Sequence, residues 1–236
     1  MEQNAGKSRM VERTVERTVE GSTVETVAIV GAAGKMGTRI ASMLEPHPDY
    51  AVLYVETAPA GLERLAARGV RVSPGEAAAE VADLVVLAVP DTLLGEVARQ
   101  LVPAMKPGAV LVCLDPAAPY AGALPERLEV SFFLTHPSHP PLFVDYDDPA
   151  ARRDYWGFGH AKQSIVNALI SGDEAAYARG ERLARAMFGP ILNSYRLTLE
   201  QIALLEPALS ETVALLCVDT MREGLREVVR RGVPED

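Results

Sequence analysis

Cysteine is scarce in this sequence: Cys113 and Cys217 are the only two among 236 residues. Two cysteines this far apart provide neither a disulfide framework nor the CxxC pairs of a structural zinc site. Disulfide-stabilised secreted scaffolds are thereby excluded. So few thiols are typical of a reducing compartment, and we predict a cytoplasmic protein.

Basic charge and long apolar runs are also lacking. Lys and Arg number 23 against 32 Asp and Glu, a net charge of −9, which repels phosphate backbones and predicts no nucleic-acid partner. Met1–Asn4 does not open a signal peptide, and the apolar run Leu84–Val89 is far shorter than the roughly 18 residues of a membrane helix. We therefore predict no membrane partner.

Composition changes once, near residue 25. Residues 1–25 are polar and repeat Val-Glu-Arg-Thr at 11–14 and 15–18. Such a segment buries too little apolar surface to offset the entropy lost on ordering, which predicts a disordered tail. A short helix or an added strand is the alternative, because the repeat alternates Val with polar residues.

From residue 26 onward, short β-branched runs alternate with helical periodicity, the pattern of α/β proteins with a mostly parallel sheet. We expect strands at 26–30, 51–56, 84–88, 109–114, 130–135, 164–169 and 191–197. Helices are expected at 34–45, 60–68, 75–81, 91–104, 119–127 and 173–188, with Asp91 as an N-cap. These elements predict a doubly wound Rossmann domain over residues 26–196, followed by a short helical segment at 197–236 for substrate binding and dimerisation.

The first strand runs into a glycine-rich turn and then a helix. Gly31 permits the tight turn, Gly34 lets the backbone approach a pyrophosphate, and Gly37 lets the helix pack closely on the strand. This G-x-x-G-x-x-G spacing predicts a dinucleotide site, with a purely structural turn as the alternative. The predicted binding residues here are Gly31, Ala33, Gly34, Lys35, Met36 and Gly37.

The second strand ends at Glu56, 25 residues after the first glycine, near the spacing of the acid that binds the adenosine ribose. A carboxylate there repels the 2′-phosphate of NADP, and the nearby cation, Arg64, lies in the following helix. NAD is therefore the predicted cofactor, with a solvated strand-end acid as the alternative.

Two later strands end in acidic turns. Val89, Pro90 and Asp91 follow one strand, and Asp115 follows the next. Ligands of open α/β sheets bind outside the carboxyl ends of the strands, so we expect these residues to line the nicotinamide half of the site. Ordinary turn chemistry is the alternative.

Two of the four histidines, His136 and His139, lie in a proline-rich segment after the strand at 130–135. The prolines favour polyproline II, in which residues three apart point the same way but stand about 9 Å apart. One metal ion could not bind both without a bend. We predict that one is a metal ligand or base and the other a donor to the substrate; the alternative is that both are simple loop residues.

His160 and Lys162 precede the strand at 164–169. A histidine or lysine near a nicotinamide could move the hydroxyl proton during hydride transfer, which makes Lys162 a candidate catalytic residue. A solvated loop is the alternative.

The last helix, about 197–231, contains Pro207, which kinks it or starts it anew. Glu206 stands among apolar residues and is a candidate metal ligand, with a neutral or ion-paired acid as the alternative. Glu211 lies five residues on, about 140° around an α-helix, so we expect it outside the site of Glu206.

Five stretches, 31–37, 82–91, His-Pro-Ser-His-Pro at 136–140, 157–163 and Leu-Glu-Pro-Ala-Leu-Ser-Glu at 205–211, carry a resemblance. Together they resemble the D-apionate oxidoisomerase family, which is phosphogluconate-dehydrogenase-like and more distantly similar to ketol-acid reductoisomerases. The resemblance spans residues 26–236. The glycine turn is generic, whereas the His-Pro and Glu-Pro motifs single out the family.

The resemblance implies an NAD-linked oxidation of a branched polyhydroxy acid such as D-apionate, coupled to migration of a carbon substituent and assisted by a divalent metal ion. In the ketol-acid enzymes two acids one helical turn apart bind magnesium; Glu206 matches that region, and Glu211 is off by one residue. An imidazole and a carboxylate together can hold such a cation, so His136 and Glu206 are the predicted metal ligands. With His139 and Lys162 they are also the predicted catalytic residues.

Two other functions fit the same residues. A redox sensor or partner-binding module could keep the nucleotide site without the chemistry, and a plain hydroxy-acid dehydrogenase would oxidise its substrate without migration. Hydride transfer to NAD on addition of a polyhydroxy acid separates the first from an enzyme, and product structure separates the second.

The last helix is too apolar to lie bare in water, with Ile202, Leu209, Leu216 and Leu225 among its residues. It should fold onto the sheet domain or pair with a second copy, and we predict a homodimer. Relatives are expected to continue beyond Gly232 with helices that complete the active-site roof. We therefore expect impaired catalysis where that roof is absent or borrowed.

Overall fold

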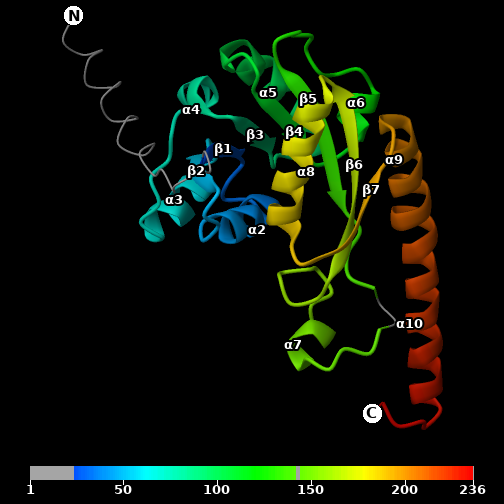
Figure 1. Ribbon diagram of the computed structural model, residues 1–236. Coiled ribbons are helices and arrows are strands. Elements are labelled where there is room, and N and C mark those ends of the chain that lie inside the picture. The colour runs from blue at the N-terminus through cyan, green and yellow to red at the C-terminus, as the bar shows by residue number, and fades with distance from the viewer. Residues whose placement is uncertain (1–23, 142–143, 236) are drawn as a thin grey trace, which may run out of the picture.

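The strands form one seven-stranded sheet in the order β2-β1-β3-β4-β5-β6-β7 (Figure 1). The structure, a computed structural model, describes residues 24–141 and 144–235. Strands β1 to β5 are parallel, β6 is antiparallel to β5, and β7 is parallel to β6. The strands are β1 (Glu25–Val30), β2 (Tyr50–Val55), β3 (Leu84–Leu87), β4 (Val110–Cys113), β5 (Ser131–Pro137), β6 (Gln163–Ser171) and β7 (Ile191–Arg196). The predicted mostly parallel Rossmann sheet is confirmed.

Helices cover both faces of the sheet. They are α2 (Lys35–Leu44), α3 (Pro59–Ala67), α4 (Gly75–Val81), α5 (Asp91–Leu101), η2 (Val102–Ala104), α6 (Ala117–Tyr120), α7 (Pro149–Arg152), α8 (Glu174–Phe188), α9 (Leu199–Leu205), η3 (Glu206–Ala214) and α10 (Leu215–Arg230). The central strands β3 and β4 are buried throughout, as expected for β-branched and leucine runs covered on both sides. Alternate strand residues therefore point into two separate cores.

One core joins the sheet to α2 and α8, with Ile29, Val112, Ile40 and Met187 among its buried residues. The other joins it to α4, α5 and α9 through residues such as Ala28, Leu111, Leu94 and Ile202. Chain order reverses at β1, which lies between β2 and β3. The carboxyl ends of the strands at such a point form the crevice where α/β proteins bind ligands.

The C-terminal segment is one long helix that stands along the edge of the molecule (Figure 1). Its middle part, η3, is a π-helix, and Pro207 lies in its first turn. The helix thus neither kinks sharply nor restarts: the wider π turn absorbs the missing N–H and the bulk of the proline ring. A capping box between Thr198 and Gln201 fixes its start.

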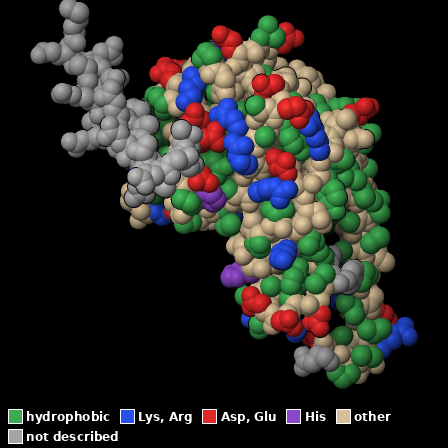
Figure 2. Space-filling model, viewed as in Figure 1, with side chains coloured by type: hydrophobic (Ala, Val, Ile, Leu, Met, Phe, Trp, Pro, Cys, Tyr) green, Lys and Arg blue, Asp and Glu red, His purple; other side chains and the backbone are tan. Residues whose placement is uncertain are grey.

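Most of this helix is uncovered. Ile202 is buried, whereas no residue of the fully described stretch 206–230 is. Figure 2 shows hydrophobic side chains along this edge, while the front over α8 mixes both signs of charge. With a mean hydropathy of 1.5 over its most apolar window, Leu199–Arg230 is also long and apolar enough to cross a membrane. The absence of a membrane partner remains a prediction.

The structure differs from the sequence-based expectations in three places. The helix expected at 119–127 is the single turn α6, because Gly122 follows it with a left-handed φ of +70° and Pro125 has no N–H with which to continue a helix. The short helix α7 was not expected. The disordered tail was predicted at residues 1–25, of which residues 1–23 lie outside the described part of the chain. Its boundary was placed too late, because Glu25 already belongs to β1 and pairs with Tyr50 of β2.

Candidate functional site

The glycine turn is shaped as a dinucleotide site requires. Gly31 has a φ of +80°, and a Cβ there would overlap the carbonyl oxygen of Ala88. A Cβ at Gly37 would overlap the Gly31 carbonyl. Helix α2 begins directly after Gly34, which provides no side-chain cap. The N–H groups of Lys35 and Met36 therefore stay available for phosphate at the positive end of the helix.

Glu56 is held beside this turn. Its Oε2 accepts a hydrogen bond from the N–H of Ala33 at 3.1 Å, and its Oε1 accepts from Thr57 at 2.9 Å. Arg64, which the sequence places in the next helix, donates from Nη2 to the Ala33 carbonyl at 3.2 Å. A carboxylate and a guanidinium thus flank the adenosine end of the predicted cofactor site.

The turn Val89-Pro90-Asp91 follows β3 at the carboxyl edge, as expected. Asp91 is not the N-cap of α5: Pro90 occupies that position, and Asp91 is the first helical residue with no capping side chain before it. Desolvation raises the pKa of Asp91, and the carboxylates of Asp115 and Glu211 raise it further. Asp91 is therefore close enough to Asp115 and Glu211 for their charges to act on it.

His136 and Glu206 lie together. The His136 Nε2 is 3.5 Å from Glu206 Oε1, and the Nδ1 is 2.9 Å from the Leu114 carbonyl oxygen. A carbonyl can only accept, so Nδ1 carries a proton and donates it. In the neutral ring Nε2 then faces the carboxylate with a lone pair, and a proton or a cation between them would remove the repulsion.

The surroundings of Glu206 are acidic. Burial is the largest influence and raises the pKa of Glu206, while His136 opposes the rise. The carboxylates of Asp115, Glu211 and Asp91 raise it further. A charged Glu206 side chain that is 11% exposed among other acids is costly, which favours a bound proton or cation.

Glu211 was expected to lie outside the site of Glu206, but it lies close to it. Its charge raises the pKa values of both Glu206 and Asp91. The expectation assumed an α-helix, but residues 206–214 form a π-helix. Hydrogen bonds in a π-helix join residues five apart, so Glu206 and Glu211 lie on successive turns.

His139 occupies a different place from His136. The expected polyproline II segment is absent at 136–139, because His136 and Pro137 are the last residues of β5 and His139 has a φ of +56°. The His139 ring packs edge-on against Trp156, with centroids 5.4 Å apart. Partial desolvation, with the charges of His136 and Arg39, lowers the pKa of His139 and favours the neutral ring.

Lys162 directly precedes β6, and both it and His160 are exposed. Because β6 is antiparallel to β5, its start lies at the carboxyl edge, where Pro137 pairs with Ile165. Lys162 is thus at the edge of the sheet that the predicted role requires.

Two residues of this region escaped the sequence analysis. Arg39 is 6% exposed, and its Nη2 donates to the Gly157 carbonyl at 2.7 Å. Asp154 is also 6% exposed and accepts three backbone N–H groups. A charged residue within the apolar stripe of Met36, Ile40 and Met43 was the available signal for Arg39.

Across the residues the structure describes, no group of three or more His, Cys, Asp or Glu side chains is placed to enclose a metal ion. The nearest approach to such a centre is the pair His136 and Glu206, with the three other acids around it.

Residues 26–117 match the family of NADP oxidoreductases that are coenzyme F420-dependent, and residues 144–236 match the C-terminal family of decarboxylating phosphogluconate dehydrogenase. The chain is 49% identical to the D-apionate oxidoisomerase of Cupriavidus necator, over 90% of this chain and 77% of that protein. It is 47% identical to the D-apionate oxidoisomerase of Rhizobium rhizogenes, over 89% and 76%. The chain belongs to the D-apionate oxidoisomerase family.

Solved structures agree with this membership. One is the crystal structure of a semialdehyde dehydrogenase NAD-binding protein from Cupriavidus necator in complex with calcium and NAD. It superimposes with a TM-score of 0.82 and is 49% identical, over 89% of this chain and 76% of that one. An NADH-preferring ketol-acid reductoisomerase from an uncultured archaeon, at 22% identity and a TM-score of 0.64, covers 89% and 63% and shares the fold. The predicted family, the Rossmann fold and the NAD-dependent oxidoreductase class are confirmed.

Proposed function

We propose that this member of the D-apionate oxidoisomerase family oxidises D-apionate, or a closely similar branched polyhydroxy acid, with NAD and couples the oxidation to a metal-assisted carbon migration. One observation carries the proposal. The two motifs that single out the family, at 136–140 and 205–211, meet through His136 and Glu206 at the carboxyl edge of the nucleotide-binding sheet. A plain dinucleotide-binding module needs no such pair.

The residues present fit both implied groups. The overlap that any Cβ at Gly31 would cause, and the uncapped start of α2, fit a pyrophosphate. The imidazole Nε2 and the carboxylate of Glu206 fit a divalent cation, and Glu211 is the carboxylate on the next turn of the same π-helix. When bound, NAD would accept a hydride and the cation would stabilise negative charge on the substrate oxygens.

The chain's own side chains supply binding and proton transfer. Lys162 would take the proton of the hydroxyl group whose carbon loses the hydride. His139, with a neutral ring, would donate a hydrogen bond to the substrate. The Leu114 carbonyl holds His136 in the tautomer that leaves Nε2 available toward Glu206.

Three measurements test the proposal. Incubation with D-apionate and NAD should produce NADH, and NMR of the product should show a rearranged carbon skeleton. Hydride transfer without rearrangement would identify a plain hydroxy-acid dehydrogenase. NAD binding without any NADH formation would identify a silent sensor and reject the enzyme assignment for this substrate.

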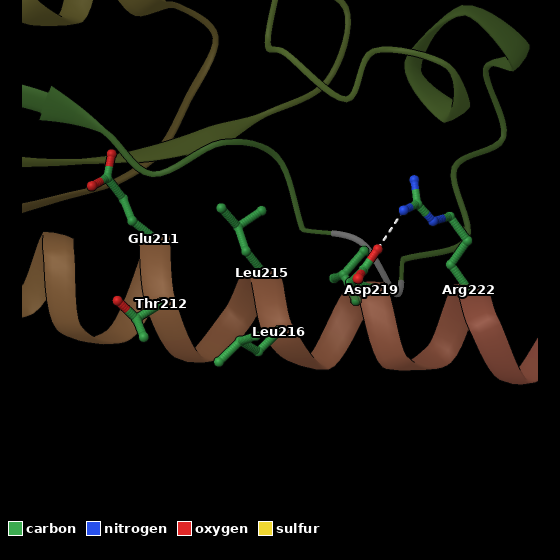
Figure 3. Close-up of a pocket in the computed structure, with 7 residues that line it drawn as sticks. Glu211, Thr212, Leu215, Leu216, Asp219 and Arg222 are labelled. Atoms are coloured by element: carbon green, nitrogen blue, oxygen red, sulfur yellow. Dashed lines mark hydrogen bonds and ion pairs between the residues drawn. The ribbon is translucent and has the colours of Figure 1, made fainter.

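We also propose that a second copy of the chain covers the uncovered helix, in a cytoplasmic homodimer. A groove of about 540 Å³ follows η3 and α10. In Figure 3, Glu211 and Leu215 point from the helix toward the neighbouring strand and loop, whereas Thr212 and Leu216 point away. Exposed apolar side chains continue along the helix and include Leu209, Leu216, Met221 and Leu225. A patch of this kind is costly in water and typical of an interface.

A further inference from the structure

Arg39 connects the nucleotide-binding helix to a loop of the substrate side. It lies on α2, one turn after Lys35, and is 6% exposed. Besides donating to the Gly157 carbonyl at 2.7 Å, its guanidinium lies 5.7 Å from the Phe158 ring centroid and 5.3 Å from that of Phe188. The planar guanidinium donates a hydrogen bond and also lies against aromatic rings, and a lysine ammonium cannot reproduce both contacts.

The loop that Arg39 contacts, residues 154–161, is held in one conformation from within. Asp154 accepts from the N–H groups of Phe158 at 2.6 Å, His160 at 2.9 Å and Ala161 at 3.0 Å. Gly157 has a φ of +69°, and a Cβ there would lie 2.6 Å from the buried Gln163 amide. These contacts tie the loop together, so a contact made at Gly157 positions its neighbours as well.

This loop carries Trp156, which packs on His139. The two rings meet edge-on at 80°, with centroids 5.4 Å apart. His139 holds a left-handed backbone conformation, φ +56°, which a non-glycine residue adopts at a cost and which its surroundings must support. The ring of Trp156 is one such support.

We propose that Arg39 is a positioning residue for the substrate site: it anchors loop 154–161 to α2 and thereby keeps Trp156 against His139. This inference rests on the proposed function, in which His139 donates to the substrate. Arg39 itself acts through the loop and touches no reacting atom. The anchor also makes the substrate side depend on the helix that begins at the phosphate turn.

A double-mutant cycle read out by tryptophan fluorescence tests, without substrate, whether Arg39 keeps Trp156 against His139. Trp156 is the single tryptophan of the chain, so emission excited at the red edge reports on it alone. His139→Ala should change this emission in the wild-type background, because the imidazole contacts the indole. In an Arg39→Lys background the same change should be absent, because the released loop has already separated the rings. An equal change in both backgrounds would overturn the proposal.

Steady-state kinetics test whether losing this anchor impairs the reaction without weakening NAD binding. Arg39→Lys should lower kcat/KM for D-apionate by about tenfold or more while leaving the Kd for NAD within about twofold. Trp156→Ala, at an exposed position that does not endanger folding, should give the same pattern. Arg185→Lys, an exposed arginine on α8 paired with Glu181, is the matched control and should change neither.

The outcomes separate the two proposals. A wild-type protein that oxidises D-apionate while Arg39→Lys and Trp156→Ala leave kcat/KM unchanged rejects the positioning role. A wild-type protein that does not oxidise D-apionate rejects the proposed function, and the fluorescence cycle then still decides whether Arg39 holds Trp156 against His139. If Arg39→Lys fails to fold, Trp156→Ala decides: an unchanged kcat/KM overturns the proposal.

Discussion

His136 and Glu206, 70 positions apart in the sequence, meet with Nε2 and Oε1 at 3.5 Å. The first is the penultimate residue of β5 and the second opens η3, so the pair joins the sheet to the C-terminal helix. The His136 Nδ1 donates to the Leu114 carbonyl, so Nε2 of the neutral ring directs a lone pair at the Glu206 carboxylate. A proton or a cation bound between the two side chains would therefore be stabilised. This relationship underlies the first prediction.

His136→Ala and Glu206→Gln should each weaken divalent-ion binding by about tenfold or more, because each removes one of two ligands. Isothermal titration with Mg²⁺, Mn²⁺ and Ca²⁺ measures this. Circular dichroism should show both variants folded, and His47→Ala, a loop histidine, is the control. Formation of rearranged product at the full rate in the presence of a chelator would contradict the prediction.

Glu56 should make NAD bind at least tenfold more tightly than NADP, about 1.4 kcal/mol, because its carboxylate repels a 2′-phosphate. Glu56→Gln should reduce the ratio, and the adjacent Arg64 would then favour NADP. Glu63→Gln, an exposed acid on α3, should leave the ratio unchanged. Equal affinities in the wild-type protein would reject this role of Glu56.

Lys162→Met should lower kcat by about 10²-fold or more, since a general base is removed, while NAD binding is kept. Stopped-flow measurement of NADH formation under single-turnover conditions isolates the step. Lys35→Met, at the phosphate turn, should instead weaken NAD binding. A Lys162→Met enzyme with normal hydride transfer would assign the proton to another group.

Asp154 should make the protein sensitive to acid. Burial acts to raise the pKa of Asp154, but hydrogen bonds from Ala161, Phe158 and His160 outweigh it and lower the pKa below 3.8. Its stabilisation is therefore present above pH 3.8 and is lost as the pH falls through the lower folded value. Asp154→Asn should cost about 1–3 kcal/mol at neutral pH.

Thermal unfolding of the wild-type protein and Asp154→Asn at several pH values checks this. The difference in Tm should be largest near neutrality and should shrink below pH 3.8. A difference that stays constant down to low pH would show that the Asp154 charge is irrelevant to the loop. Asp145→Asn, whose side chain is 93% exposed, is the control.

The apolar helix should hold a dimer together. Light scattering of the wild-type protein should give twice the chain mass at micromolar concentration, and Leu216→Glu should give a monomer, since Leu216 is 63% exposed and points away from its own domain. Leu62→Glu, a single exposed leucine on α3, is the control. A wild-type monomer would reject the dimer, and binding to lipid vesicles would identify a membrane as the occupant.

Much of the fold could be predicted because burial imposes local patterns. Runs such as Leu84–Leu87 and Val110–Cys113 are apolar at every position, which fits a strand covered on both faces. The helix at 119–127 failed because Gly122 takes a left-handed conformation that ends α6 after one turn. Asp91 failed as a cap since proline, with its fixed φ, took the preceding position.

The site was predictable in its residue types but not in its geometry. His136 and Glu206 were paired on chemistry and lie together. Glu211 was expected elsewhere because five residues span about 140° in an α-helix, and no local sequence pattern predicts the π-helix. The apolar stripe of α2 could mark Arg39 as buried, but not its partner. The contacts of Arg39 and Trp156 join distant parts of the chain, and periodicity within one element does not predict them.

The π-helix at Glu206–Ala214 also fixes the rotational phase of α10. Its wide turns keep Glu206 and Glu211 on one side of the helix, while Leu216 points away from the neighbouring strand. If the same residues took α geometry, Glu211 would lie about 140° around the helix from Glu206, and every side chain of α10 would turn with it. The acid and the face that carries Leu216 would leave their present directions together, so loss of the π turns would disturb ion binding and subunit pairing at once.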